Sequence, residues 1–281
     1  MSLRNKSIIF VFTTDRDIEV KRHIINAIND YKIPCWDIPD GCYYLNLYYE
    51  GQNERIYWSY LRNRSIALRI QNGHIQFIES PTTSENRRII NGLPVDIKTI
   101  HKYLQPSSLS QSNATEIQSL ANSITRFKIT PMQKVLAIHD WVASNVYYDI
   151  DALHSGKSNM MAYTALDVLR EKKCVCRGYA NLGVALMRAA GIPAIGLHCY
   201  ALNIDSGGGW ERIENQTNIP NHIIAVAYVG RRWTLMDITW DSDNSFVDNK
   251  FQRITGMGTS RKYFDSTLEM ISNTHKFILD F

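Results

Sequence analysis

Three residues of the sequence have side chains that together could perform cysteine catalysis: Cys176, His222 and Asp237. A thiolate is a strong nucleophile, and a neighbouring imidazole can take the thiol proton and later give it to a leaving amine. A carboxylate on the other imidazole nitrogen fixes the tautomer and orientation of the ring. The chemistry predicted from this set is attack on a peptide or carboxamide carbonyl, through a thioester and with release of an amine.

Cys176 stands at the start of a run that is typical of a buried helix. From Ala180 to Ala190 only Asn181 and Arg188 are polar, and Gly191 follows as a stop signal. A thiol at the N-terminal end of a helix is close to unpaired backbone N–H groups and to the positive end of the helix dipole, which favour thiolate. Cysteine beside an apolar helix is nevertheless usually a packing residue. The assignment therefore depends on partners elsewhere in the chain.

The partners lie in a predicted β-hairpin. Two β-rich runs, 222–229 and 232–240, flank Gly230-Arg231. A two-residue turn of the type with Gly first pairs the last residue of one run with the first residue of the other, and it places His222 opposite Thr239.

In this register Asp237 lies two residues from the partner of His222, so both side chains project from the same face as diagonal neighbours. A loop one residue longer or shorter would put them on opposite faces. A nucleophile on a helix, followed in the chain by His and Asp on adjacent strands, is also how papain-like cysteine enzymes divide the work. The pattern predicts a triad of Cys176, His222 and Asp237.

The rest of the chain provides the elements that hold these residues. We expect helices at Asp15–Tyr31, Thr115–Arg126, after Pro131 and at Ala162–Glu171, strands at Ile8–Phe12, Tyr43–Tyr49 and Ile195–Leu202, and a hairpin around Asn72-Gly73. The polar stretches 80–91 and 105–115 indicate connecting segments. We interpret His139 and Asp140, on the helix after Pro131, as structural residues, and Gly207-Gly208-Gly209 as a flap beside the site. The predicted domains are a small α+β module at 1–110 and a catalytic domain at 111–281.

Several motifs together resemble the transglutaminase-like superfamily, in its bacterial type. These are VCRGYA around Cys176 with AAGIPA after it, His222 opening a strand, WTLMDITWD around Asp237, KVLAIHDWVASNVYYD before them and KYFDSTLEMISNTHKF at the end. The resemblance covers residues 126–281 and implies a papain-like α+β core, no cofactor, Cys176 as nucleophile, His222 as general base and acid, and Asp237 as its orienting partner. Ile223-Ile224-Ala225 departs from the Ala-Trp-Asn that often follows the histidine, a difference that concerns the acceptor side.

Composition excludes some other classes. The 281 residues contain 31 Lys and Arg against 27 Asp and Glu, without a basic block, which argues against nucleic-acid binding. No apolar run is long enough to cross a bilayer or to form a signal-peptide core. The family resemblance is compatible with export or the cell surface. Five cysteines cannot all form disulfides within the chain, although the sequence allows a disulfide between Cys35 and Cys42 in an oxidising compartment.

The function expected from the sequence is a hydrolase, a peptidase or amidase acting on a protein or peptide, including cell-envelope material. A protein-crosslinking transglutaminase and a non-catalytic binding module on the same fold are the alternatives. A zinc site at Cys174, Cys176, His198 and Cys199 is disfavoured, because Cys-x-Cys followed by His-Cys is not a familiar zinc spacing. We expect neither a metal nor a cofactor.

Overall fold

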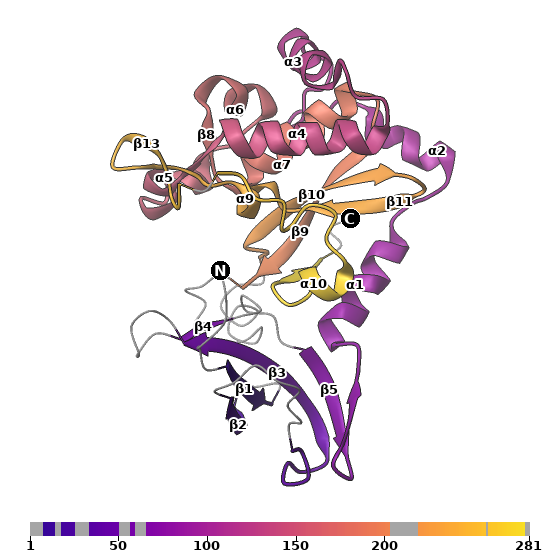
Figure 1. Ribbon diagram of the computed structural model, residues 1–281. Coiled ribbons are helices and arrows are strands. Elements are labelled where there is room, and N and C mark those ends of the chain that lie inside the picture. Colours follow the sequence, from indigo (N-terminus) through magenta and orange to yellow (C-terminus); the bar gives the residue numbers. More distant parts are fainter. Residues whose placement is uncertain are drawn as a thin grey trace. The chain divides into compact units, whose positions relative to one another are not determined.

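A computed structural model describes residues 8–14, 18–25, 34–50, 57–59, 66–202, 219–256 and 258–278 (Figure 1). The chain divides into two units, one made of residues 1–87, 200–219 and 268–276 and the other of residues 88–199, 220–267 and 277–281. Each unit combines helices with β-strands, so the α+β class is confirmed. The predicted domain division at residue 110 stays a prediction. None of the helices in the described ranges has the length and apolar character needed to span a membrane.

The first unit is built on an antiparallel sheet with the strand order β2-β1-β3-β5-β6, and β4 pairs with β3. Its apolar core includes Phe12, Leu68 and Ile70. Cys35 and Cys42 both lie among the described residues and are not joined by a disulfide, so the pairing that the sequence allowed is not formed. The strands are β1 (Ile8–Thr13), β2 (Glu19–Ile25), β3 (Gly41–Glu50), β4 (Tyr57–Ser59), β5 (Ile66–Gln71) and β6 (His74–Phe77).

The helix predicted at Asp15–Tyr31 is wrong where the chain is described. Residues 19–25 form β2, which pairs antiparallel with β1 from Ile8↔Ile25 onward. The isoleucines have a spacing that suits a helix, but β-branched residues favour strands, and the open edge of β1 offers backbone partners. Residues 15–17 and 26–31 of the predicted helix lie outside the described residues.

The hairpin at Asn72-Gly73 is confirmed, since β5 pairs with β6 around a turn in which both residues have positive φ, 49° and 74°. The polar stretch 80–91, predicted as a connection, instead forms helix α1 (Pro81–Gly92). Asn86 is fully buried there, and its amide donates to Ser272 Oγ and to the His275 carbonyl at 2.8 Å each. Buried amide hydrogen bonds of this kind leave little signal in hydrophobic periodicity. The short helix α10 (Leu268–Ile271) belongs to the same unit.

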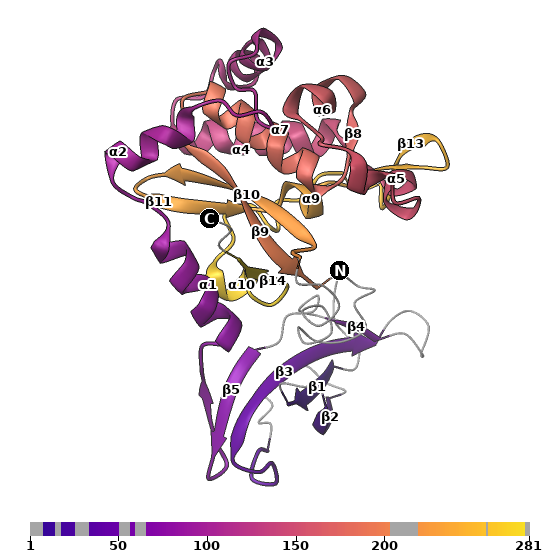
Figure 2. The ribbon, with the colours of Figure 1, turned by 180° about the vertical axis from the view of Figure 1, so that it is seen from behind.

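The second unit has a helical layer, which both views place on one side of the sheet that contains β10 (Figure 1, Figure 2). Its core includes Ile138 of α4 and Leu182 of α7 as well as Ala225 of β10. Thr130 and Gln133 cap α4 reciprocally, and Pro131 occupies its first turn. The helices of this unit are α2 (Ile97–Ile100), η1 (His101–Leu104), α3 (Thr115–Thr125), α4 (Pro131–Asn145), α5 (Ile150–His154), η2 (Lys157–Met160), α6 (Ala165–Glu171), α7 (Cys176–Ala189) and α9 (Ile238–Asp241).

The sheet under these helices has the order β11-β10-β9-β14. Its strands are β9 (Ala194–Ala201), β10 (His222–Val229), β11 (Arg232–Met236) and β14 (His275–Phe277). The predicted pairing of Val229 with Arg232 is confirmed. The turn type is not, because Gly230 and Arg231 both have positive φ, 61° and 65°, which is the I′ geometry and not the form with only Gly positive.

A second, mixed sheet carries the chain into α7. Its order is β13-β12-β7-β8, with β7 parallel to both β12 and β8. The strands are β7 (Tyr147–Asp149), β8 (Lys173–Cys174), β12 (Asn244–Val247) and β13 (Lys250–Arg253). Because β8 ends at Cys174 and α7 begins at Cys176, this sheet fixes where the proposed nucleophile stands.

Candidate active site

Cys176 is the first residue of α7, as the sequence predicts, and it is partly exposed. The body of the helix is buried from Gly178 to Met187. The N-cap residue Val175 makes no side-chain capping hydrogen bond. The first N–H groups of a helix have no acceptor within the helix and carry its positive dipole end. The thiol therefore stands at a position that stabilises negative charge.

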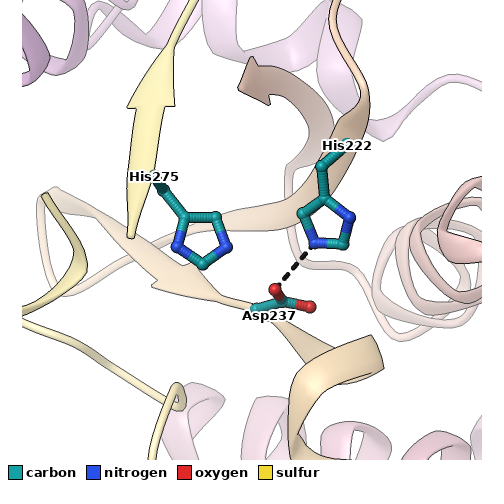
Figure 3. A group of neighbouring side chains, drawn as sticks. All are labelled: His222, Asp237 and His275. Atoms are coloured by element: carbon teal, nitrogen blue, oxygen red, sulfur yellow. Dashed lines mark hydrogen bonds and ion pairs between the residues drawn. The ribbon is translucent and has the colours of Figure 1, made fainter. Parts of the chain in front are cut away.

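His222 and Asp237 are brought together. His222 opens β10, and its Nε2 lies 2.7 Å from Asp237 Oδ2 (Figure 3). The His222 residue is 8% exposed and Asp237 is 0% exposed. Burial on this scale strengthens the charge interaction, because little water remains to screen it. The prediction that these two side chains face one another agrees with the geometry.

The backbone route to this contact differs from the prediction. Strand β11 ends at Met236, and Thr239 belongs to helix α9, so Thr239 does not lie opposite His222. Asp237 is the N-cap of α9, and its Oδ1 accepts a hydrogen bond from the Trp240 backbone N at 3.0 Å. The carboxylate thus caps a helix through one oxygen and contacts the imidazole through the other.

The pKa of His222 is set by opposing effects. Burial alone lowers it, but the charge of Asp237, the hydrogen bond to Asp237, and a side-chain hydrogen bond and charge interaction with Cys176 all raise it. The net result is a pKa above the ordinary value of 6.5. The imidazolium form is therefore favoured, which is the form that pairs with a thiolate.

Aromatic rings lie beside the imidazole. The Trp240 ring is tilted against His222 with centroids 5.6 Å apart, and Tyr263 packs edge-on against Trp240 at 5.4 Å. Trp240 is half-buried next to the proposed base. A ring in this position limits the access of water to the His222–Asp237 pair.

The two other thiols near the site are fully buried. Cys174 and Cys199 are both inaccessible, and burial is the main cause that raises the pKa of each. Zinc binds the thiolate form, so these surroundings disfavour the zinc cluster considered from the sequence. Among the described residues, the group of side chains close enough together to share one metal ion contains none of the four residues of that cluster. The glycines 207–209, predicted as a flap, lie outside the described residues.

A second buried histidine was assigned a structural role from the sequence. His139 of α4 has its Nδ1 3.1 Å from Asp140 Oδ1 and its Nε2 3.1 Å from Asp241 Oδ2. Asp241 also accepts hydrogen bonds from the Ser260 hydroxyl and, at 3.0 Å, from the Tyr263 backbone N. Sequence reasoning did not identify Asp241, because it lies 102 positions from His139 and only the fold brings the two together.

Residues 118–238 match the family model described as Transglutaminase-like superfamily. Kyphoscoliosis peptidase of Mus musculus is 25% identical over 170 residues, which are 60% of this chain and 24% of that protein, so the chain spans about a quarter of its length. A Cytophaga hutchinsonii structure described as a "Putative Cysteine Protease" is 22% identical, with a TM-score of 0.41 over 91% of this chain and 81% of that chain. The periplasmic domain of TgpA from Pseudomonas aeruginosa is 13% identical, with a TM-score of 0.38 over 84% of this chain and 88% of that one.

Proposed function

Because residues 118–238 form a domain of the transglutaminase-like superfamily, we propose that this chain is a cysteine-dependent acyl-transfer enzyme acting on peptide or glutamine carboxamide bonds. Cys176 is the nucleophile, His222 the general base and acid, and Asp237 the residue that orients the imidazole. The observation that carries the proposal is the buried His222–Asp237 hydrogen bond on an imidazole that also interacts with Cys176.

The proposed role of each residue follows from the proton that it gives or takes in the reaction. The thiol proton moves to His222, and the Cys176 thiolate bonds to the carbonyl carbon while the carbonyl π electrons move to oxygen. When the tetrahedral intermediate collapses, the C–N bond breaks and His222 gives its proton to the departing amine. Asp237 stays ionised and stabilises the imidazolium throughout. The resulting thioester is resolved by water or by a second amine, with His222 again as base.

Hydrolysis is the outcome that we favour over crosslinking. The mouse relative is named a peptidase, and its similarity includes more than half of this chain. Ile223-Ile224-Ala225 also departs from the Ala-Trp-Asn that often follows the histidine in the family, on the side expected to receive an acceptor amine. A protein or peptide is the substrate class that fits the proposal.

Alkylation of Cys176 tests the proposed pair. The protein is treated with iodoacetamide at pH 6, and modification of Cys176 is followed by mass spectrometry in wild type, His222→Ala and the matched control His139→Gln. Wild type and His139→Gln should react rapidly and His222→Ala much more slowly, because a thiolate needs its imidazolium partner at this pH. Equally slow reaction in all three proteins would overturn the assignment of Cys176 and His222.

Incubation with a glutamine-containing peptide distinguishes hydrolysis from transamidation. Ammonia release without an added amine indicates hydrolysis, and incorporation of a primary amine such as putrescine indicates transamidation. Mass spectrometry reports both products in one experiment. Cleavage of the peptide backbone instead would identify a peptidase, whereas rapid alkylation without any of these products would favour a binding module on the same fold.

A further inference from the structure

Tyr148 lies on the strand next to the one that leads into Cys176. In the parallel pairing of β7 with β8, Tyr148 is the register partner of Cys174, two residues before the nucleophile. Residues paired in this way project from the same face of a sheet, and the next residue along each strand projects from the other. The side chain of Tyr148 therefore lies on the face that Cys174 occupies.

That face is the one covered by the first turn of α7. A Cβ added to Gly178 would come within 2.4 Å of Cys174 Sγ, so the Cys174 side chain lies directly under this turn. Tyr148 packs against the same apolar core, to which Cys174 also belongs. Tyr147 projects the opposite way, and its ring contacts Phe251 with centroids 4.8 Å apart. The two adjacent tyrosines thus project from opposite faces of the sheet, and of the two it is Tyr148 that faces the helical turn carrying Cys176.

The Tyr148 hydroxyl can donate a hydrogen bond, and among the described residues it has no acceptor. It makes no hydrogen bond to any residue in the described ranges, although the side chain is half-buried. Burial is the main cause that raises the pKa of this phenol, and the nearby charges of Cys176, Cys174 and Asp237 raise it further. The group therefore stays protonated over the whole range in which a cysteine enzyme works, so it can only donate to an anion and does not become one.

We propose that Tyr148 is a catalytic residue that donates its phenol O–H to the carbonyl oxygen of the acyl group, beside the backbone N–H of Cys176. The inference rests on the proposed function. As Sγ bonds to the carbonyl carbon, the π pair becomes a negative charge on oxygen, and two preorganised donors stabilise it more than the neutral carbonyl. When the C–N bond breaks and the amine leaves with the proton from His222, the carbonyl re-forms and the phenol is unchanged.

The test compares a reaction that forms an oxyanion with one that does not. Acylation of Cys176 by p-nitrophenyl acetate passes through a tetrahedral oxyanion, whereas alkylation by iodoacetamide is a direct displacement at carbon. Tyr148→Phe should slow acylation by about 100-fold, the usual cost of removing one oxyanion donor, and leave alkylation within about twofold. Tyr147→Phe is the matched control and should change neither rate.

The remaining outcomes of this comparison would each overturn the role proposed for Tyr148. Acylation at the wild-type rate in Tyr148→Phe, with wild type itself active, overturns the role of Tyr148 and leaves the proposed function intact. Loss of both reactions in Tyr148→Phe overturns it as well, because the hydroxyl would then be supporting the site structurally. Absence of acylation in wild type, together with alkylation that does not depend on His222, overturns the proposed function itself and this inference with it.

Discussion

The two ends of helix α9 each hold a buried pair of histidine and aspartate, and the pairs differ in what else the histidine contacts. At the start, Asp237 bonds His222, which also interacts with the Cys176 side chain. At the end, Asp241 bonds His139, whose other nitrogen lies against Asp140. Both imidazoles have a raised pKa, against the opposing effect of burial. A buried His–Asp pair is therefore not by itself a sign of catalysis.

The His139 pair has the features of a structural clamp. Its two nitrogens face two carboxylates, and Asp140 is paired in turn with Arg261 at 2.6 Å. The segment that follows α9 is tied to the same carboxylate through Ser260 and Tyr263. Ion pairs of this kind favour one packing arrangement, and both ring nitrogens of His139 are engaged by carboxylates of the protein itself. The His222–Asp237 pair differs in that its imidazole also interacts with the Cys176 thiol, and this contact is the basis of the catalytic role proposed for it.

The largest expected effect is the difference between removing one histidine and the other. His222→Ala should lower the rate of Cys176 acylation by about 10²–10⁴-fold, since it removes a general acid and base. His139→Gln should lower it by less than about tenfold, because this residue has no part in proton transfer. Acylation by p-nitrophenyl acetate, followed as nitrophenol release, measures both. Similar losses in the two variants would end the distinction drawn between the pairs.

The next largest effect is on stability. Asp241→Ala should lower the free energy of unfolding by about 3–5 kcal/mol, because it leaves the buried His139 cation and the Tyr263 N–H without their shared acceptor. Asp265→Ala is the control, since it breaks the exposed ion pair with Arg232 and should cost less than about 1 kcal/mol. Urea denaturation at pH 6.5 measures both values. Equal losses of unfolding free energy in the two variants would show that the buried His139–Asp241 pair contributes no more stability than an exposed ion pair.

The raised pKa values give a pH dependence of known sign. A histidine whose folded pKa lies above its unfolded value of 6.5 contributes stability that is fully present below pH 6.5 and is lost as the pH rises through the folded pKa. Wild type, with two such residues, should lose stability above pH 6.5 more steeply than His139→Gln, by up to about 1.4 kcal/mol per pH unit. Urea midpoints at pH 6, 7 and 8 compare the slopes, and parallel curves would contradict the assigned protonation of His139.

The smallest effect concerns the exposed edge of the clamp. Arg261→Gln removes the partner of Asp140 at a position where the arginine side chain is 61% exposed, so the loss of stability should stay below about 1 kcal/mol. Thermal unfolding is sufficient to detect it. A loss comparable to that of Asp241→Ala would mean that Arg261 belongs to the buried network and not to its surface.

The sequence was sufficient to predict the His222–Asp237 contact. In a hairpin, the face from which a strand residue projects depends only on whether the connecting loop has an even or an odd number of residues. The two-residue turn kept that parity even though its type was different. The sequence was not sufficient to predict the position of Thr239. Asp237 ends the strand because it caps α9, and local β-propensity does not indicate where such a cap forms.

Residues without a periodic signal were harder to predict. Asp241 becomes a partner of His139 only after the chain has folded, and the isoleucine spacing of residues 18–28 suits a helix as well as a strand. Tyr148 could have been noticed in the sequence as a tyrosine next to Asp149, but its direction depends on the parallel pairing of β7 with β8. Parallel pairing joins distant segments, which short-range patterns do not encode.

The carboxylate of Asp237 divides its two oxygens between a helix N-terminus and an imidazole. Rotation of this carboxylate would break both contacts at once, so its orientation is settled when the protein folds and not when a substrate arrives. In the proposed reaction, alignment of the imidazole then requires little reorganisation in the transition state, and substrate binding energy remains available to hold the acyl group against the Cys176 thiolate. Under the proposed function, a helix cap in this position makes the rate of the chemical step depend on the rigidity of the fold.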